Sequence, residues 1–299
     1  MHPMASRSNH LPSQESQDAA VTTASPENLP RTSLLPVPIP AYDAYVFDLD
    51  GTLYLGDELL PRAAETVSVL RERGAVVRFV SNNPTRSPAQ YVAKLAGLGI
   101  DVTLEEIVTP VVTVVRWLLE NAAGAVVFPI APEPVVAALT EAGIAVDDDP
   151  GRIDIVLASY DRSFDYAKLQ IAFDAIWYHR RARLMSTNPD RFCPFPGGRG
   201  EPDAAAIVAA IEASTGVACE RTFGKPHPEV LRLALQGVDV ELGRLLMVGD
   251  RLATDIAMGV AAGAATALVL TGDSTAEQAA ALPERDRPTH VLDGVGDLI

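Results

Sequence analysis

The feature that most constrains the fold is a short apolar run that ends in two aspartates. Residues 44–47 are apolar and indicate a buried strand. Asp48 and Asp50 follow this run, one residue apart, just before Gly51. Buried parallel strands are apolar almost throughout, so two carboxylates there need a reason. In open α/β sheets ligands bind outside the carboxyl ends of strands, and two close carboxylates favour a bound cation. An ordinary Asp-rich turn is the alternative for this segment taken alone.

Composition and charge narrow the class of protein. The chain has 299 residues, 48% of them hydrophobic, and a formal net charge of -15. This is typical of a globular protein with one large domain or two ordinary ones. The acidity disfavours nucleic acid and anionic membranes as partners, and no apolar run reaches the length of a membrane span. Cys193 and Cys219 have neither disulfide-framework nor zinc spacing, which fits a cytoplasmic protein.

Strands and helices alternate along the chain, with one interruption. Residues 1–40 are rich in Ser, Pro, Thr, Asn and Gln, and we expect a disordered tail. Over 41–109 the order strand, helix, strand, helix predicts a parallel sheet with right-handed crossovers. A second alternation over 110–186 is long enough for a small α/β domain, and the first pattern resumes over 187–299. We therefore expect an α/β fold: a doubly wound parallel sheet with residues 110–186 inserted, and a boundary near the Gly- and Pro-rich stretch 194–202.

At four places polar groups follow an apolar strand or lie in a loop before a helix, and together they make a coherent phosphate site. They are Asp48 and Asp50, Ser81 and Asn82, Lys225, and Asp250 with Asp255. Carboxylate oxygens, completed by water and phosphate, suit Mg²⁺. A carboxylate can act as a nucleophile, and a hydroxyl, backbone N–H groups and a lysine can hold phosphoryl oxygens.

With these motifs the sequence resembles the haloacid dehalogenase superfamily of phosphohydrolases, over nearly all of residues 42–295. Further segments resemble one branch, subclass IIA, which contains 4-nitrophenylphosphatase, phosphoglycolate phosphatase and nucleotide phosphatases with a large α/β cap. The resemblance implies a Rossmann-like core with an inserted cap. The segments are Gly51-Thr-Leu-Tyr-Leu-Gly56, Ser81-Asn-Asn83, Thr187-Asn-Pro-Asp190, Gly224-Lys-Pro226 and Gly249-Asp-Arg-Leu-Ala-Thr-Asp-Ile256.

The resemblance also implies roles for the central residues. Asp48 would attack phosphorus, and Asp50 would protonate the leaving oxygen and later activate water. Asp48, the backbone carbonyl of Asp50, and Asp250 would hold Mg²⁺. Ser81 and the Asn82 backbone would bind phosphate oxygens together with the turn at Gly51. Lys225 would offset the negative charge of nucleophile and phosphate.

Several residues keep two interpretations. Asp255 is expected to contact the metal through water or to orient Lys225, and helix capping is the alternative. Asn188 and Asp190 lie at the expected junction of cap and core, where substrate contact and ordinary turn chemistry are both open. For His227 a surface or capping role is expected, and for Trp117 packing within an amphipathic helix.

The resulting prediction is a Mg²⁺-dependent phosphatase. It would hydrolyse a small phosphate monoester, such as a sugar, polyol, glycolate or nucleotide phosphate, through an aspartyl-phosphate intermediate. One rival is a phosphotransferase or mutase on the same core, and another is a non-catalytic protein that binds a phosphorylated metabolite. Caps of this type often dimerise in the family, so a homodimer is among the expectations.

Overall fold

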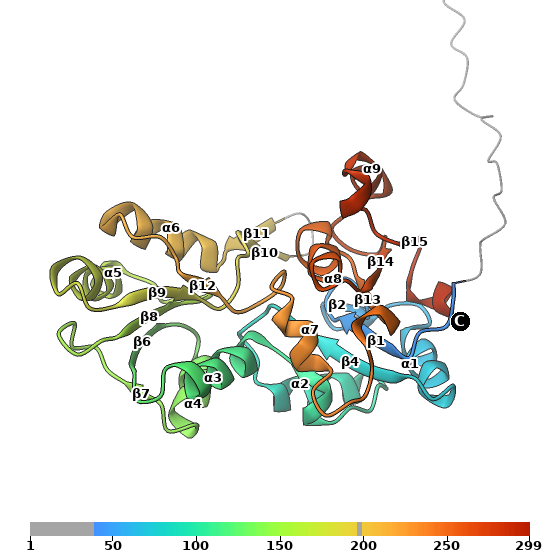
Figure 1. The fold of residues 1–299 in the computed structure, drawn as a ribbon, viewed down its shortest axis with the longest axis horizontal. Coiled ribbons are helices and arrows are strands. Elements are labelled where there is room, and N and C mark those ends of the chain that lie inside the picture. Colours follow the sequence, from blue (N-terminus) through green and yellow to red (C-terminus); the bar gives the residue numbers. More distant parts are fainter. Residues whose placement is uncertain (1–38, 196–198) are drawn as a thin grey trace, which may run out of the picture. The chain divides into compact units, whose positions relative to one another are not determined.

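The structure is a computed structural model that describes residues 39–195 and 199–299 (Figure 1). The predicted tail lies almost wholly outside the described residues, so it stays a prediction. Among the residues that the structure describes, no helix combines the length and the apolarity needed to cross a bilayer.

The first sheet has six strands, all paired in parallel, in the order β15-β14-β13-β1-β4-β5. From the central β1 the chain moves outward through β4 and β5, and later returns to β13 on the other side of β1. Such a reversal is the switch point at which ligands bind in doubly wound sheets. The strands are β1 (Ala44–Asp48), β4 (Val76–Val80), β5 (Ile107–Val108), β13 (Leu245–Gly249), β14 (Ala265–Val269) and β15 (His290–Leu292).

Helices cover both faces of this sheet. Successive side chains of a strand point to opposite faces, so an apolar strand presents apolar side chains on both faces and both must be covered. Tyr45 and Phe47 pack on the side of α1 and α2, whereas Ala44 and Val46 pack on the side of α7 and α8. Apolar runs buried on both faces produce the predicted doubly wound core, which the structure confirms. The covering helices are α1 (Ala63–Glu72), α2 (Pro88–Gly97), α7 (Glu229–Ala234) and α8 (Ala257–Ala262).

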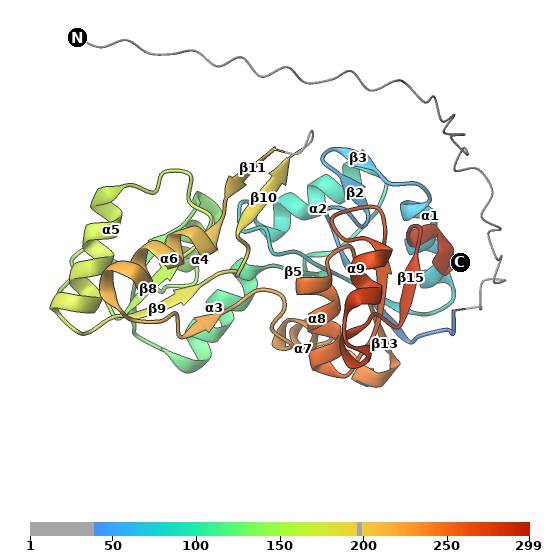
Figure 2. The same cartoon turned by 90° about the horizontal axis from the view of Figure 1, so that it is seen from above.

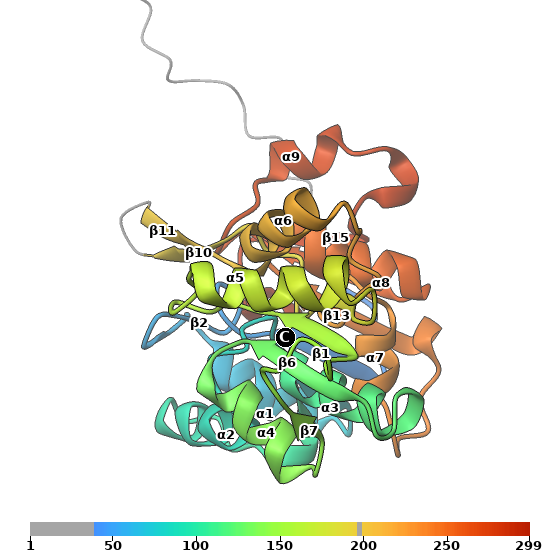
Figure 3. The same cartoon turned by 90° about the vertical axis from the view of Figure 1, so that its left-hand side faces the viewer.

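The second sheet is also parallel, with the order β12-β9-β8-β6-β7. Helices α3 and α4 pack on one face, and α5 and α6 on the other (Figure 3). The strands are β6 (Val126–Ile130), β7 (Ala145–Val146), β8 (Ile155–Ala158), β9 (Arg183–Ser186) and β12 (Arg221–Thr222). The helices are α3 (Pro110–Asn121), α4 (Glu133–Glu141), α5 (Tyr166–Phe173), continued by the π-helix η2 (Asp174–Tyr178), and α6 (Ala204–Thr215).

The expected boundary between inserted cap and core does not coincide with the division between the sheets. Residues 187–222 were assigned to the core, yet β12 pairs with β9 of the second sheet. Ile207 and Ile211 of α6 are buried against the same sheet. By sheet membership the second unit therefore extends to Thr222. The physical reason is that apolar side chains of α6 pack on this face.

Two short antiparallel hairpins were not predicted (Figure 2). One consists of β2 (Tyr54–Leu55) and β3 (Glu58–Leu59), and the other of β10 (Phe192–Phe195) and β11 (Arg199–Pro202). The second lies in the stretch that was expected to be a boundary. The remaining elements are α9 (Ala276–Ala281), the π-helix η4 (Leu252–Ile256), and the 3-10 turns η1 (Leu104–Glu106), η3 (Leu242–Arg244), η5 (Glu284–Asp286) and η6 (Val295–Leu298).

Candidate active site

The predicted polar groups converge at the carboxyl ends of three neighbouring strands. Asp48 ends β1, Ser81 follows β4 and Asp250 follows β13. These groups border a cavity of about 300 Å³, which the two unpredicted hairpins also line through Leu55, Phe192 and Cys193. Strand order alone places these ends together, because β1 lies between β13 and β4.

A buried cluster of carboxylates lies at the base of this cavity. Carboxylate oxygens of Asp48, Asp250 and Asp255 all lie within 4.8 Å of one another. The ammonium group of Lys225 forms ion pairs with Asp48 and, at 2.7 Å, with Asp255. Burial alone would lower the pKa of Lys225, but the charges of Asp255 and Asp48 outweigh it and raise that pKa. Lys225 is therefore a permanent cation beside the predicted nucleophile.

Asp250 shows that the cluster suits a divalent cation. Its Oδ2 accepts a hydrogen bond of 2.8 Å from the backbone N–H of Asp273, whereas its buried Oδ1 finds no hydrogen-bond partner within the described residues. Burial and the nearby Asp48 raise the pKa of Asp250 to about 8. A carboxylate oxygen left without a donor is costly, and an all-oxygen donor set is the one that Mg²⁺ prefers. The residues present thus fit the predicted metal.

The lining of the cavity as a whole supports the same conclusion. Among the described residues of this lining, six aspartates face two basic residues, Lys225 and Arg251. A phosphate monoester is itself an anion, so a bound cation would be needed to balance the charge. The aspartates are Asp48, Asp50, Asp190, Asp203, Asp250 and Asp273.

Asp50 differs from Asp48 in its surroundings. Asp48 is 6% exposed and accepts a hydrogen bond of 3.4 Å from Thr52 Oγ1, whereas Asp50 is exposed at the cavity. Loss of hydration against the cavity walls, with the charge of Asp48, raises the pKa of Asp50, although a hydrogen bond from the Gly56 N–H opposes the shift. Asp50 therefore retains a proton more readily than an ordinary aspartate, as a general acid must.

The turn after these aspartates requires glycine. Gly51 has φ +88°, and a Cβ atom built there would lie 2.6 Å from Asp250 Oδ2. Its carbonyl oxygen accepts a hydrogen bond of 2.6 Å from Thr271 Oγ1. The turn thus brings backbone close to the carboxylate cluster, where only a residue without a side chain fits.

Ser81 and Asn82 have separate tasks. Ser81 Oγ lies 3.1 Å from the hydroxyl of Tyr91 and accepts a hydrogen bond from the Asn83 N–H, and Ser81 borders the cavity. The Asn82 side chain accepts a hydrogen bond from the Lys225 N–H and donates to the Lys225 carbonyl and to Asp190. The amide of Asn82 is therefore used inside the protein, which leaves its backbone for the predicted phosphate contact.

Asn188 and Asp190 have different surroundings in the structure. Asn188 is fully buried and is absent from the cavity lining; its side chain donates to the Asn82 carbonyl and accepts from the Asp190 N–H. Asp190 does line the cavity. Asn188 thus joins the segments that carry Asn82 and Asp190, and of the two predicted residues Asp190 is the one that lines the cavity.

Asp255 contacts Lys225 directly, which is the contact that one of its three interpretations, orientation of Lys225, requires. Its other oxygen, Oδ2, accepts a hydrogen bond of 3.0 Å from the Arg251 N–H at the start of η4. One carboxylate therefore makes both the contact suited to orienting Lys225 and the contact suited to capping a helical turn.

Asp203 and Arg251 are among the cavity residues that sequence reasoning missed. Asp203 is buried and accepts a hydrogen bond of 2.5 Å from the Ala204 N–H at the start of α6, and its burial raises its pKa to about 6. Arg251 follows Asp250 and forms no ion pair within 4.0 Å among the described side chains. The sequence signals were an aspartate before a helix and an arginine after a motif, and neither reveals a cavity.

Comparison with known proteins agrees with this geometry. A family model described as haloacid dehalogenase-like hydrolase matches residues 45–145, and one described as HAD-hydrolase-like matches residues 222–298. The acid sugar phosphatase of Staphylococcus haemolyticus is 35% identical over 251 residues, which cover 83% of this chain and 92% of that protein.

Two solved structures are similar over most of their length. The 4-nitrophenylphosphatase of Thermotoga maritima has a TM-score of 0.79 and 32% identity, covering 86% of this chain and 96% of its own. The glycerol phosphate phosphatase of Mycobacterium tuberculosis in complex with magnesium has a TM-score of 0.78 and 30% identity, with 86% and 77% covered. The chain therefore belongs to subclass IIA of the haloacid dehalogenase superfamily and is a phosphatase of that type.

Proposed function

We propose that this phosphatase hydrolyses a small sugar or polyol phosphate in a Mg²⁺-dependent reaction through an aspartyl phosphate on Asp48. The observation that carries the proposal is the buried group of Asp48, Lys225, Asp250 and Asp255 beneath a cavity that also holds Asp50. It combines a nucleophile, a fixed cation, a metal-ligand set and a separate acid in one place.

In the first half of the reaction Asp48 attacks phosphorus and the bond to the leaving oxygen breaks. Lys225 stabilises the charge of nucleophile and phosphoryl group, and Ser81 with the backbone at Gly51 holds phosphoryl oxygens. Asp50, with its raised pKa, protonates the leaving oxygen. Asp48, Asp250 and the Asp50 carbonyl would hold Mg²⁺, which would supply further charge stabilisation. In the second half Asp50, now ionised, takes a proton from water, which hydrolyses the aspartyl phosphate.

Lining residues beside the carboxylate cluster favour a leaving group rich in hydroxyls. Asp190 and Asp203 offer hydrogen-bond acceptors, Arg251 offers donors, and Phe192 offers an apolar ring. A second anionic group, as in phosphoglycolate, would meet these carboxylates and be repelled. Two of the similar proteins are named for a sugar phosphate or glycerol phosphate activity, which supports this choice.

A phosphate-release assay tests the activity and the metal together. With Mg²⁺ we expect turnover of sugar and polyol phosphates above that of phosphoglycolate; excess EDTA should abolish it and Mg²⁺ should restore it. Full activity in EDTA would rule out the proposed mechanism. Preference for phosphoglycolate would leave the mechanism intact but refute the leaving-group assignment.

Rapid-quench labelling with a phosphate-labelled substrate tests the nucleophile. The native chain should become labelled as an acyl phosphate, and Asp48→Asn should not. Asp148→Asn is the matched control, because Asp148 is exposed on a loop outside the cavity lining and should label normally. Labelling of Asp48→Asn would show that another residue accepts the phosphoryl group.

A further inference from the structure

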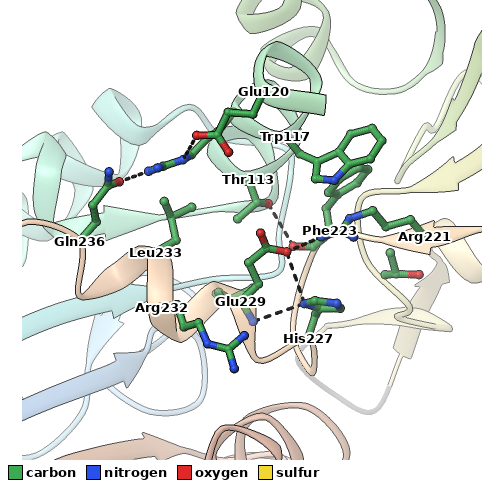
Figure 4. Close-up of a pocket in the computed structure, with 13 residues that line it drawn as sticks. Thr113, Trp117, Glu120, Arg221, Phe223, His227, Glu229, Arg232, Leu233 and Gln236 are labelled. Carbon is green, nitrogen blue, oxygen red and sulfur yellow. Dashed lines mark hydrogen bonds and ion pairs between the residues drawn. The ribbon is translucent and has the colours of Figure 1, made fainter. Parts of the chain in front are cut away.

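A second cavity of about 280 Å³ lies where the chain passes between the two sheets (Figure 4). Its walls come from α3, from the segment Arg221–His227 and from α7. Within the part of the chain that the structure describes, no residue lines both this cavity and the active-site cavity. It is therefore a separate feature, and the phosphatase mechanism does not use it.

The chain crosses between the two sheets twice, first between β5 and α3 and later between β12 and α7. These two connections meet beside this cavity. Thr113, in the first turn of α3, donates a hydrogen bond of 3.0 Å from Oγ1 to the carbonyl oxygen of Phe223. The first connection thus touches the second one directly. A molecule in the cavity would contact α3, which packs on the second sheet, and α7, which packs on the first.

The lining is basic although the chain is acidic. Three arginines, Arg116, Arg221 and Arg232, face two glutamates, Glu120 and Glu229. The chain as a whole has a net charge of -15, and the active-site cavity has six aspartates against two basic residues. A local excess of arginine in such a chain points to an anionic ligand rather than to a cation or a polyol.

Not every donor in this lining has a partner among the described residues. Arg221 pairs with Glu229 and lies 5.3 Å from the ring centroids of both Trp117 and Phe223, yet its buried Nε has no hydrogen-bond partner among the described residues. Arg232 forms no ion pair with any described side chain within 4.0 Å. His227 uses Nδ1 to accept from the Glu229 N–H. Figure 4 shows Arg221, Glu229 and His227 converging, with Arg232 beside them.

We propose that this cavity binds a small anion carrying a carboxylate or phosphate group, held by Arg221 and Arg232 next to the ring of Trp117. Guanidinium groups bind both kinds of anion through paired hydrogen bonds, so the geometry identifies the shared chemistry. Bound there, the anion would contact both α3 and α7.

Tryptophan fluorescence tests the proposal directly. The chain has two tryptophans, and Trp177 is 54% exposed on η2, so Trp177→Phe leaves Trp117 as the only reporter. We would titrate Trp177→Phe, with Mg²⁺ present and ionic strength held constant, with inorganic phosphate and separately with succinate. A saturable fluorescence change is expected with at least one of them.

Two further variants in the same background locate the binding. Arg232→Gln should weaken it by about tenfold or more, the usual scale for a charge-assisted contact. Arg285→Gln is the matched control and should change nothing. Arg285 is 86% exposed on η5, and its one ion pair among the described residues is with Asp286 at 3.5 Å. A response to phosphate alone that Arg232→Gln removes supports the proposal for phosphate. No saturable change, or an unchanged midpoint in Arg232→Gln, overturns it, because phosphate would then act from the active site or not at all.

Discussion

The side chain of Asn82 holds the backbone of Lys225 at both of its polar groups. Asn82 Oδ1 accepts a hydrogen bond of 2.7 Å from the Lys225 N–H, and Asn82 Nδ2 donates one of 3.0 Å to the Lys225 carbonyl oxygen. The neighbouring Gly224 leaves room for this contact, because a Cβ atom there would lie 2.4 Å from Asn82 Oδ1. Lys225, which lies between β12 and α7, is thus positioned by a residue that follows β4.

Replacing Asn82 by alanine should therefore disable Lys225 without touching its charge. Two buried backbone groups would lose their partners, at a cost of about 2–4 kcal/mol in the free energy of unfolding. A displaced ammonium group should lower kcat by roughly 10²-fold. Denaturant unfolding and steady-state kinetics measure the two effects. The control is Asn121→Ala, at the exposed end of α3, and equal results for both variants would contradict the assignment.

Asp50→Asn should show a loss that depends on the leaving group. The amide keeps the shape of the side chain and the backbone carbonyl but cannot transfer a proton. With an alkyl phosphate we expect a loss of about 10²–10⁴-fold in kcat, since the alkoxide needs a proton. With 4-nitrophenyl phosphate the first step should survive and the second should stall, giving a burst of nitrophenolate close to one per active site. A linear time course without a burst would argue against a role for Asp50 in the second step.

Gly272→Ala should weaken Mg²⁺ binding, although Gly272 is not one of the predicted metal ligands. A Cβ atom at Gly272 would lie 2.0 Å from Asp250 Oδ2, so the carboxylate must move. We expect the Mg²⁺ concentration for half-maximal activity to rise at least about tenfold, as for other changes behind metal ligands. Gly97→Ala is the control: it lies in α2, has no heavy atom within 4 Å of the added Cβ, and should be neutral or stabilising by about 0.5–1 kcal/mol. An unchanged Mg²⁺ requirement in Gly272→Ala would refute the prediction.

Asp203→Asn should change how stability depends on pH. Burial raises the pKa of Asp203 from 3.8 to about 6, so between these values the folded state binds more protons than the unfolded state. The stabilisation from the protonated carboxyl is complete below pH 3.8 and is lost as pH rises through 6. Asparagine removes this loss and can still cap α6. Relative to the native chain, the variant should thus gain on the order of 2–3 kcal/mol between pH 4 and pH 8. Parallel curves of unfolding free energy against pH would contradict this.

Much of the fold was predictable because its signals are local. Apolar runs of four to six residues predict the strands around Asp48, Ser81 and Asp250, and the polar residue after each run marks the strand end. Parallel topology then brings these ends together, so the candidate site follows from strand order once the order is known. The structure confirms the doubly wound sheet and the α/β unit, with a second sheet, that is inserted into the chain between its strands.

The remainder depends on contacts between distant segments. Strand β12 has two residues, and it becomes a strand only because β9 lies beside it. The hairpin of β10 and β11 is rich in Pro and Gly, which locally indicate a loop. Asp203 enters the cavity because α6 packs on the second sheet, and no pattern within the sequence around it carries that information.

The hydrogen bond between Thr113 and Phe223 has a consequence for the evolution of the chain. It brings the start and the end of a segment of more than one hundred residues to neighbouring points. Insertions whose ends are close can be exchanged or lengthened without moving the structure that receives them. The segment between these two residues can thus be exchanged as a unit. Because it carries Asp190 and Asp203, an exchange would change the proposed contacts to the leaving group, while the strands that carry Asp48, Ser81 and Asp250 would remain in register.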